Sequence, residues 1–101
     1  IAKILFSGDM GASMVDDAAK PLENFAAHIP KMKSFHQRYM CSNKVIRLWV
    51  NMVRTMDIEM IVPQHGTPFI GKEQINQFLD WIETLQCGID LMDETVFTCP
   101  E

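Results

Sequence analysis

Two side chains of this 101-residue sequence occupy positions where a metal ligand could lie. Asp9 follows an apolar run that ends at Phe6, and His65 follows a second short run, Glu59 to Val62, that is predicted to be a buried strand. Each of them lies in a loop that contains glycine. In open α/β sheets, ligands bind beyond the carboxyl ends of the strands. If the two runs form neighbouring parallel strands, a carboxylate and an imidazole project from one edge, and both are suitable ligands for zinc, iron or manganese.

The spacing leaves structural roles open for these residues and for the other histidines. An aspartate after a strand is commonly a turn or cap residue, and a single histidine is commonly hydrogen-bonded within the fold. His28 precedes Pro30, and we expect it to be a surface cap at a helix end. His36 lies in an aromatic patch with Phe35 and Tyr39. It is either a partly exposed helix residue or a hydrogen-bond donor behind a metal ligand.

The elements that must position these side chains follow the order strand, loop, helices, strand, loop, helix, which is an α/β pattern. The run from Ile1 to Phe6 predicts the first strand, and residues 13–20 look like a loop. A helix is expected from Pro21, with a break or kink at Pro30, and a helical pattern then continues to Cys41. Only two strands are evident, and two strands do not make a self-sufficient sheet.

Two further helices are predicted from apolar periodicity. Ser42 is a good N-cap for the first of them, in which six apolar residues share the face that usually packs on a core. They are Val45, Leu48, Trp49, Met52, Val53 and Met56. The second begins at about Lys72 and is expected to stop at Gly88. Its apolar face contains Ile75, Phe78, Leu79, Ile82 and Leu85.

Composition and charge limit the classes of function. A hydrophobic content of 48% and a charged content of 22% exclude a disordered or low-complexity chain. No apolar run approaches the roughly 20 residues of a transmembrane helix, so no membrane partner is indicated. The net charge of −4 does not indicate a nucleic-acid binder. Three cysteines without a CxxC pair favour a reducing, cytoplasmic setting, with Cys87 in the core and Cys99 exposed.

The basic residues are concentrated in the middle of the chain. No acidic residue occurs between Glu23 and Asp57, whereas six basic residues do. They are Lys31, Lys33, Arg38, Lys44, Arg47 and Arg54. This stretch is either a solvated helix face or a surface for an anionic partner, a cofactor phosphate or an acidic domain.

The segments LFSGD at 5–9 and IVPQHG at 61–66 resemble the second half of the metallo-β-lactamase fold, an αβ/βα sandwich. The order and separation of these motifs are most similar to the flavodiiron and oxygen-binding diiron branch, over about residues 3 to 90. The resemblance implies that Asp9 bridges two metals and that His65 ligates one of them. It implies two iron ions as the cofactor, with zinc as the alternative, and places His36 and Tyr39 near the metal pocket.

The resemblance also shows what this chain lacks. The main metal motif of the family, of the His-x-His/Glu-x-Asp-His type, does not occur, and we expect it upstream of Ile1, which is not a methionine. Residues 1–90 are therefore predicted to be the C-terminal half of such a domain, and residues 91–101 a tail or the start of a linker. No catalytic residue is expected within this chain, and FMN is not supported because no flavodoxin-type phosphate loop is visible.

On this resemblance, the parent protein binds, senses or reduces dioxygen, as an oxygen-binding protein or an oxidoreductase. A zinc-dependent metallohydrolase and a non-enzymatic interaction fragment are the alternatives. The expected partners are the upstream half of the domain and dioxygen, and the isolated fragment is expected to be inactive. Because that upstream half would cover the apolar strands, we expect the fragment to self-associate as a homo-oligomer.

Overall fold

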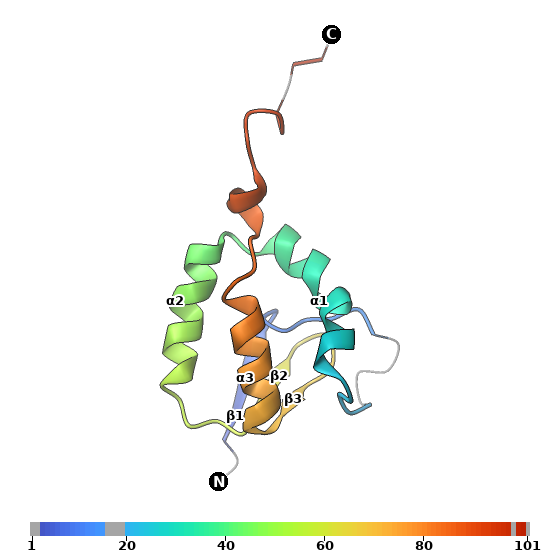
Figure 1. Cartoon of the computed structure of the whole chain (residues 1–101), viewed down its shortest axis with the longest axis vertical. Coiled ribbons are helices and arrows are strands. Elements are labelled where there is room, and N and C mark those ends of the chain that lie inside the picture. The colour runs from blue at the N-terminus through green and yellow to red at the C-terminus, as the bar shows by residue number, and fades with distance from the viewer. Residues whose placement is uncertain (1–2, 16–19, 98, 101) are drawn as a thin grey trace.

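The computed structural model describes residues 3–15, 20–97 and 99–100. Its sheet has the order β1-β2-β3, with β1 at Ile4–Gly8, β2 at Met60–Pro63 and β3 at Phe69–Ile70 (Figure 1). β1 and β2 are parallel, and β2 and β3 are antiparallel. The predicted α/β class is confirmed, and the parallel pairing is the arrangement that a shared edge for Asp9 and His65 requires. Ile1 and residues 16–19 of the predicted strand and loop lie outside the described residues.

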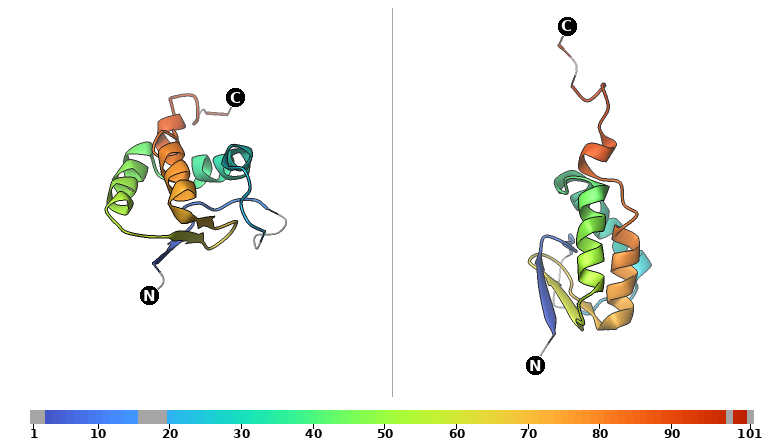
Figure 2. Two further views of the ribbon diagram at one scale, coloured as in Figure 1. Left: turned by 60° about the horizontal axis from the view of Figure 1, so that its bottom comes forward. Right: turned by 90° about the vertical axis from the view of Figure 1, so that its left-hand side faces the viewer.

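Three helices cover one face of the sheet, as the two views of Figure 2 show. They are α1 (Phe25–Tyr39), α2 (Asn43–Arg54) and α3 (Gly71–Ile82), and a short 3-10 helix, η1 (Gly88–Leu91), follows them. The outward side chains of β1 are exposed, and Phe6 keeps 75% of its surface accessible. The described part of the chain is therefore one sheet with helices on a single face.

The core lies between the sheet and the helices. Phe69 of β3 stacks on Phe78 of α3, with their ring centroids 4.5 Å apart. The apolar face predicted for α3 is confirmed, because its five residues are all buried. They pack with Met32, Ile46, Val50, Val53, Ile61, Phe69 and Cys87. Burial of this apolar surface is the main stabilising term for so small a sheet.

Helix α1 differs from its predicted form in two respects. It begins at Phe25 and not at Pro21, because Asn24 provides the cap and its Oδ1 accepts a hydrogen bond of 3.2 Å from the Ala27 N–H. It also continues through Pro30 without a break. A proline inside a helix removes one backbone hydrogen bond and crowds the preceding turn, but burial of Met32, two residues later, holds the helix on the core.

Helix α2 begins where it was predicted, with the Ser42 hydroxyl accepting a hydrogen bond from the Val45 N–H. The prediction of its core face is wrong for most of the six residues. The buried apolar residues of α2 are Ile46, Val50 and Val53, of which only Val53 belongs to the predicted stripe. The predicted Trp49 is half-buried and packs against the core. The helix carries apolar residues on two sides, and only one side meets the sheet and α3. The exposed apolar residues are Val45, Leu48, Met52 and Met56.

The C-terminal part also departs from the prediction. Helix α3 ends at Ile82, and Gly88 begins η1 instead of ending α3. The two-residue strand β3 was not predicted, because Pro68 and Gly71 flank it and make the segment look like a loop. Cys87 is buried and Cys99 is exposed, as expected.

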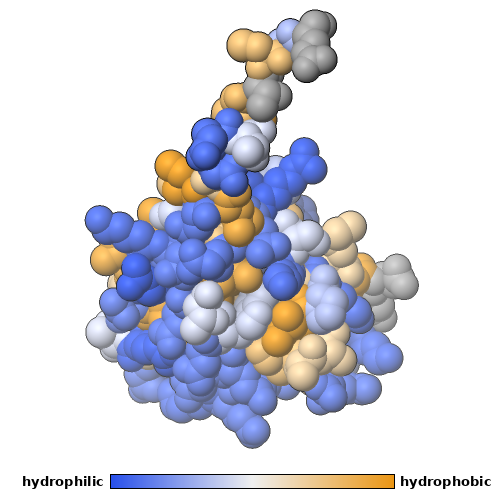
Figure 3. All heavy atoms as spheres, turned by 45° about the horizontal axis from the view of Figure 1, so that its top comes forward, coloured by the Kyte–Doolittle hydropathy of each residue, from blue (hydrophilic) through white to orange (hydrophobic). Residues whose placement is uncertain are grey.

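Residues 92–97 are exposed and project from the body of the molecule (Figure 3). No helix among the described residues is long and apolar enough to cross a membrane.

Candidate metal centre

Asp9 lies in a turn that directly follows β1. The Met10 N–H donates to the Ser7 carbonyl at 3.2 Å, and the Ser7 hydroxyl donates back to the Met10 carbonyl at 2.6 Å. The Ala12 N–H then donates to the Asp9 carbonyl at 3.0 Å. Asp9 itself is exposed, and no described residue forms a hydrogen bond with its carboxylate. The turn therefore fixes the backbone of Asp9 and leaves the carboxylate free.

His65 lies in the loop that joins β2 to β3, and this loop is hydrogen-bonded to the one that carries Asp9. The Gln64 N–H donates to the Gly8 carbonyl at 2.7 Å, and the Ser13 N–H donates to the His65 carbonyl at 3.1 Å. The Thr67 N–H donates to the Ser13 hydroxyl at 3.2 Å. The imidazole of His65 is exposed, and no described residue forms a hydrogen bond with it. The two predicted ligands thus belong to two loops that are joined at one edge of the sheet.

The close approach of the two loops depends on Gly66. A Cβ at this position would lie 2.3 Å from the Ser13 Oγ and 2.6 Å from the Ser13 N. The φ of Gly66 is also +116°, which side chains rarely adopt. A residue with a side chain would push the His65 loop away from the Asp9 loop.

His36 connects the Asp9 loop to α1. Its Nε2 accepts a hydrogen bond of 2.9 Å from the Gly11 N–H, and its Nδ1 lies 2.8 Å from the Met32 carbonyl. Because Gly11 can only donate, Nε2 carries no proton, and Nδ1 donates to Met32. Burial lowers the pKa of His36, and the Met32 hydrogen bond and the Asp9 charge oppose this only partly.

His36 is thus buried and neutral, and the expectation of a partly exposed histidine is wrong. The ring lies behind the Asp9 turn, which is compatible with the predicted role behind a metal ligand. Tyr39 is different, because it is exposed on α1 against Phe35 and under the Arg38 guanidinium. Its place near a metal pocket stays a prediction.

Gly11 is the second glycine on which this edge depends. Its φ is +93°, and a Cβ there would lie 2.8 Å from Cε2 of Phe69. The hydrogen bond from the Gly11 N–H to His36 therefore requires a residue without a side chain. The sequence points to Gly11 only as one of two glycines that give the Asp9 loop its backbone freedom, and it does not point to Ser13. The only signal was the presence of glycines in both loops, which does not reveal which residue each one contacts.

The chemistry available at this edge is that of one carboxylate and one imidazole. A carboxylate can bridge two cations and an imidazole can complete a coordination sphere, so both residues fit a metal site. Among the described residues, however, no group of three or more histidine, cysteine, aspartate or glutamate side chains could hold a metal ion. Asp9 and His65 alone do not complete a metal site, so their role as metal ligands stays a prediction.

The remaining predicted features lie elsewhere. His28 is buried, which corrects its prediction as a surface cap, and its Nε2 has no hydrogen-bond partner among the described residues. In the basic stretch, Arg54 is already paired, with Asp80 at 2.8 Å and Glu83 at 3.3 Å. Arg54, at the C-terminal end of the basic stretch, therefore takes part in ion pairs within the fold.

The chain is similar in sequence and fold to known proteins. Residues 1–66 match the family model described as ODP family beta lactamase. A solved structure described as "Peroxy diiron species of chemotaxis sensor ODP" is 46% identical, with a TM-score of 0.86, over 95% of this chain and 40% of its own. Another, "Apo state of chemotaxis sensor ODP from T. denticola", is 45% identical, with a TM-score of 0.84, over 95% of this chain and 39% of its own.

No curated protein matches the chain. The chain spans about two fifths of the length of these two solved chains. The resemblance to the metallo-β-lactamase fold is confirmed, since the family model covers well over half of the residues and the backbone superposes over nearly all of them. This chain belongs to the ODP family of beta-lactamase-like proteins.

Proposed function

We propose that this chain contributes Asp9 and His65 to a diiron site that binds dioxygen in a sensor protein. The observation that carries the proposal is the junction of the two loops, which brings a free carboxylate and a free imidazole to the ends of adjacent parallel strands. The similarity to a chemotaxis sensor with a described diiron species supports iron and dioxygen over the alternatives.

The roles of the two donors follow from their chemistry. Asp9 would hold the irons through its carboxylate oxygens, and His65 would hold one iron through an imidazole nitrogen. The remaining ligands would come from residues outside the 101 of this sequence. When bound, two ferrous ions supply the electrons that a reversible interaction with dioxygen requires.

The rest of the chain positions these donors. His36 holds the Gly11 end of the Asp9 turn on α1, and Ser13 holds the His65 loop through its N–H and its hydroxyl. Both contacts are made to the backbone of the two loops and do not involve the side chains of Asp9 and His65. The backbone of the site is therefore fixed before a metal binds, which lowers the entropic cost of binding.

The proposal is tested on the intact protein that contains this chain. It is purified without oxygen, its metals are quantified, and its visible absorption is recorded before and after exposure to air. We expect iron and an oxygen-dependent absorption band. His65→Ala and Asp9→Ala are expected to lose most of the iron and the band, because each removes a ligand.

Asp57→Ala provides a matched control, since Asp57 is an exposed carboxylate that pairs with Lys3 and Lys72 and not with the loops of the site. It is expected to keep the iron and the band. Zinc as the bound metal without an oxygen-dependent band would contradict the proposal and support a hydrolase. Retention of iron in both ligand variants would contradict the assignment of Asp9 and His65.

A sensor and an oxygen reductase differ in turnover. We propose the sensor, so the reduced protein is expected to bind dioxygen without sustained consumption when a reductant is supplied. An oxygen electrode measures this directly. Continuous consumption that scales with the concentration of the reduced protein would assign the chain to an oxidoreductase instead.

A further inference from the structure

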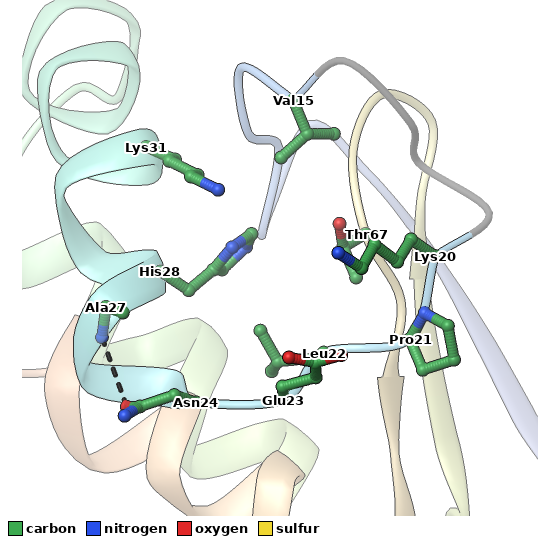
Figure 4. A pocket seen from close by; sticks show the side chains of 10 residues that line it. All are labelled: Val15, Lys20, Pro21, Leu22, Glu23, Asn24, Ala27, His28, Lys31 and Thr67. Carbon is green, nitrogen blue, oxygen red and sulfur yellow. Dashed lines mark hydrogen bonds between the residues drawn. The ribbon is translucent and has the colours of Figure 1, made fainter.

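A pocket lies between the N-terminal half of α1 and the two loops next to it (Figure 4). Its volume is about 440 Å³, which is in the range that small-molecule sites occupy. His28 and Lys31 point from α1 across the pocket toward Val15 and Thr67. Neither Asp9 nor His65 lines it.

Hydrogen bonds hold the walls of this pocket in place. The Met14 N–H donates to the Lys31 carbonyl at 3.0 Å and so joins the Val15 wall to α1. The Gln74 Nε2 donates to the Leu22 carbonyl at 3.0 Å and fixes the wall that enters α1. Two sides of the pocket are therefore held in place by hydrogen bonds.

His28 is the feature that points to a ligand. Only 4% of its surface is exposed, yet its Nε2 has no hydrogen-bond partner among the described residues. Leaving a buried polar atom unpaired is energetically costly, and most such atoms in folded proteins have a partner. The ring packs edge-on against Phe69. Burial and the nearby Lys31 charge lower the pKa of His28, so the ring is neutral and a protonated Nε2 can donate to an oxygen atom.

The charges around the pocket favour an anion. Among the described residues that line it, Lys20 and Lys31 are basic and Glu23 is the one carboxylate. Asn24 and Ala27 also line it, and they belong to the capped first turn of α1. The N-terminus of a 15-residue helix adds a positive potential at this end.

The opposite part of the lining is apolar and comes from Val15, Pro21 and Leu22. A bare inorganic ion would leave this surface in contact with water. A small organic molecule with one oxyanion group would contact it with its carbon skeleton and place its oxygens near the histidine and the lysines.

We propose that this pocket binds a small organic anion, a carboxylate or phosphate ester, whose oxygen accepts a hydrogen bond from the Nε2 of His28 and pairs with Lys31. The apolar body of the ligand lies on Val15 and Leu22. This proposal does not depend on the metal site, because neither Asp9 nor His65 lines the pocket.

Benzoate and phenyl phosphate are the probes, and benzyl alcohol is their uncharged counterpart. The intact protein, labelled with ¹⁵N in its histidine rings, is titrated with each of them and observed by NMR. We expect the His28 ring signals to shift saturably with at least one of the two anions and not with benzyl alcohol. The anion that binds more tightly distinguishes a carboxylate ligand from a phosphate ester.

Lys31→Met tests the charge contact without disturbing the core, since Lys31 is exposed. It is expected to weaken binding about tenfold, the effect of losing one charge-assisted hydrogen bond. Lys33→Met is the matched control on the same helix, and it is expected to bind like the parent because Lys33 does not line the pocket.

His28→Leu is expected to abolish the binding of both anions and to keep the fold, which the amide spectrum checks. Three results would overturn the proposal. They are no saturable shift with either anion at millimolar concentration, equal binding of benzyl alcohol, and equal binding by Lys31→Met and the parent.

Discussion

His28 and His36 lie on the same helix, two turns apart, and both are buried, but their rings are in opposite situations. His36 uses both nitrogens, one toward Gly11 and the other toward Met32. The Nε2 of His28 has no partner among the described residues. The comparison teaches that burial does not reveal the role of a histidine. The satisfied ring is a structural support for the site, and the unsatisfied ring is the one with capacity for a ligand.

Removing the satisfied ring should have the largest effect. His36→Ala leaves the Gly11 N–H without its acceptor and opens a cavity in the core, so we expect a loss of about 2–4 kcal/mol in the free energy of unfolding. Urea denaturation of the metal-free protein measures it. A change below about 0.5 kcal/mol, the size of a surface effect, would show that the ring does not support the loop.

A substitution of Gly11, which donates a hydrogen bond to the His36 ring, tests the same contact. Gly11→Ala places a methyl group 2.8 Å from Cε2 of Phe69 and requires a strained φ of +93°. We expect a loss of roughly 1–3 kcal/mol in the same measurement. Gly8→Ala is the control for backbone strain alone, because its φ is also positive but a Cβ there would meet no atom within 4 Å. Equal losses in the two variants would contradict the packing argument.

Acidification should destabilise the protein through both rings. Each pKa is lower in the folded state than its ordinary value of 6.5, so the unfolded chain binds more protons below that pH. The stabilisation is complete above about pH 6.5 and is lost as the pH falls through the folded pKa values. Urea denaturation across this range should show a smaller pH dependence in His28→Leu, with the His36 part remaining. A pH-independent free energy of unfolding would contradict this assignment.

The smallest effect is expected for the unsatisfied ring. His28→Leu removes a buried polar atom that has no partner and keeps an apolar side chain against Phe69. We expect a change within about 1 kcal/mol in either direction. A loss as large as that of His36→Ala would mean that His28 is a structural residue, and the contrast between the two histidines would disappear.

The sequence predicts the ends of adjacent strands well and the surroundings of buried residues poorly. The position of Asp9 and His65 at one edge of the sheet could be predicted because each follows an apolar run and lies in a glycine-containing loop, which is typical of the end of a parallel strand. The contacts of His36 and Ser13 could not be found, because they join residues that are far apart in the chain. The α2 stripe was misassigned for a related reason, since apolar periodicity does not say which of two apolar sides meets the core.

The boundary errors have local causes. Pro30 was expected to interrupt α1, but a cap at Asn24 and burial of Met32 outweigh one missing hydrogen bond. The strand β3 is only two residues long and lies between Pro68 and Gly71, so it leaves no periodic pattern to detect. Its importance comes from Phe69, which supports Gly11 and stacks on Phe78.

The contact between Gly66 and Ser13 has a consequence for engineering. It holds the backbone of the two loops without using either donor side chain. The side chains at positions 9 and 65 can therefore be replaced while the backbone of the two loops keeps its conformation. Replacing His65 by cysteine or glutamate in the intact protein would offer a softer or a harder atom at the same backbone position, and metal preference could be varied there by single substitutions. Inserting one residue into either loop would instead shift both positions together.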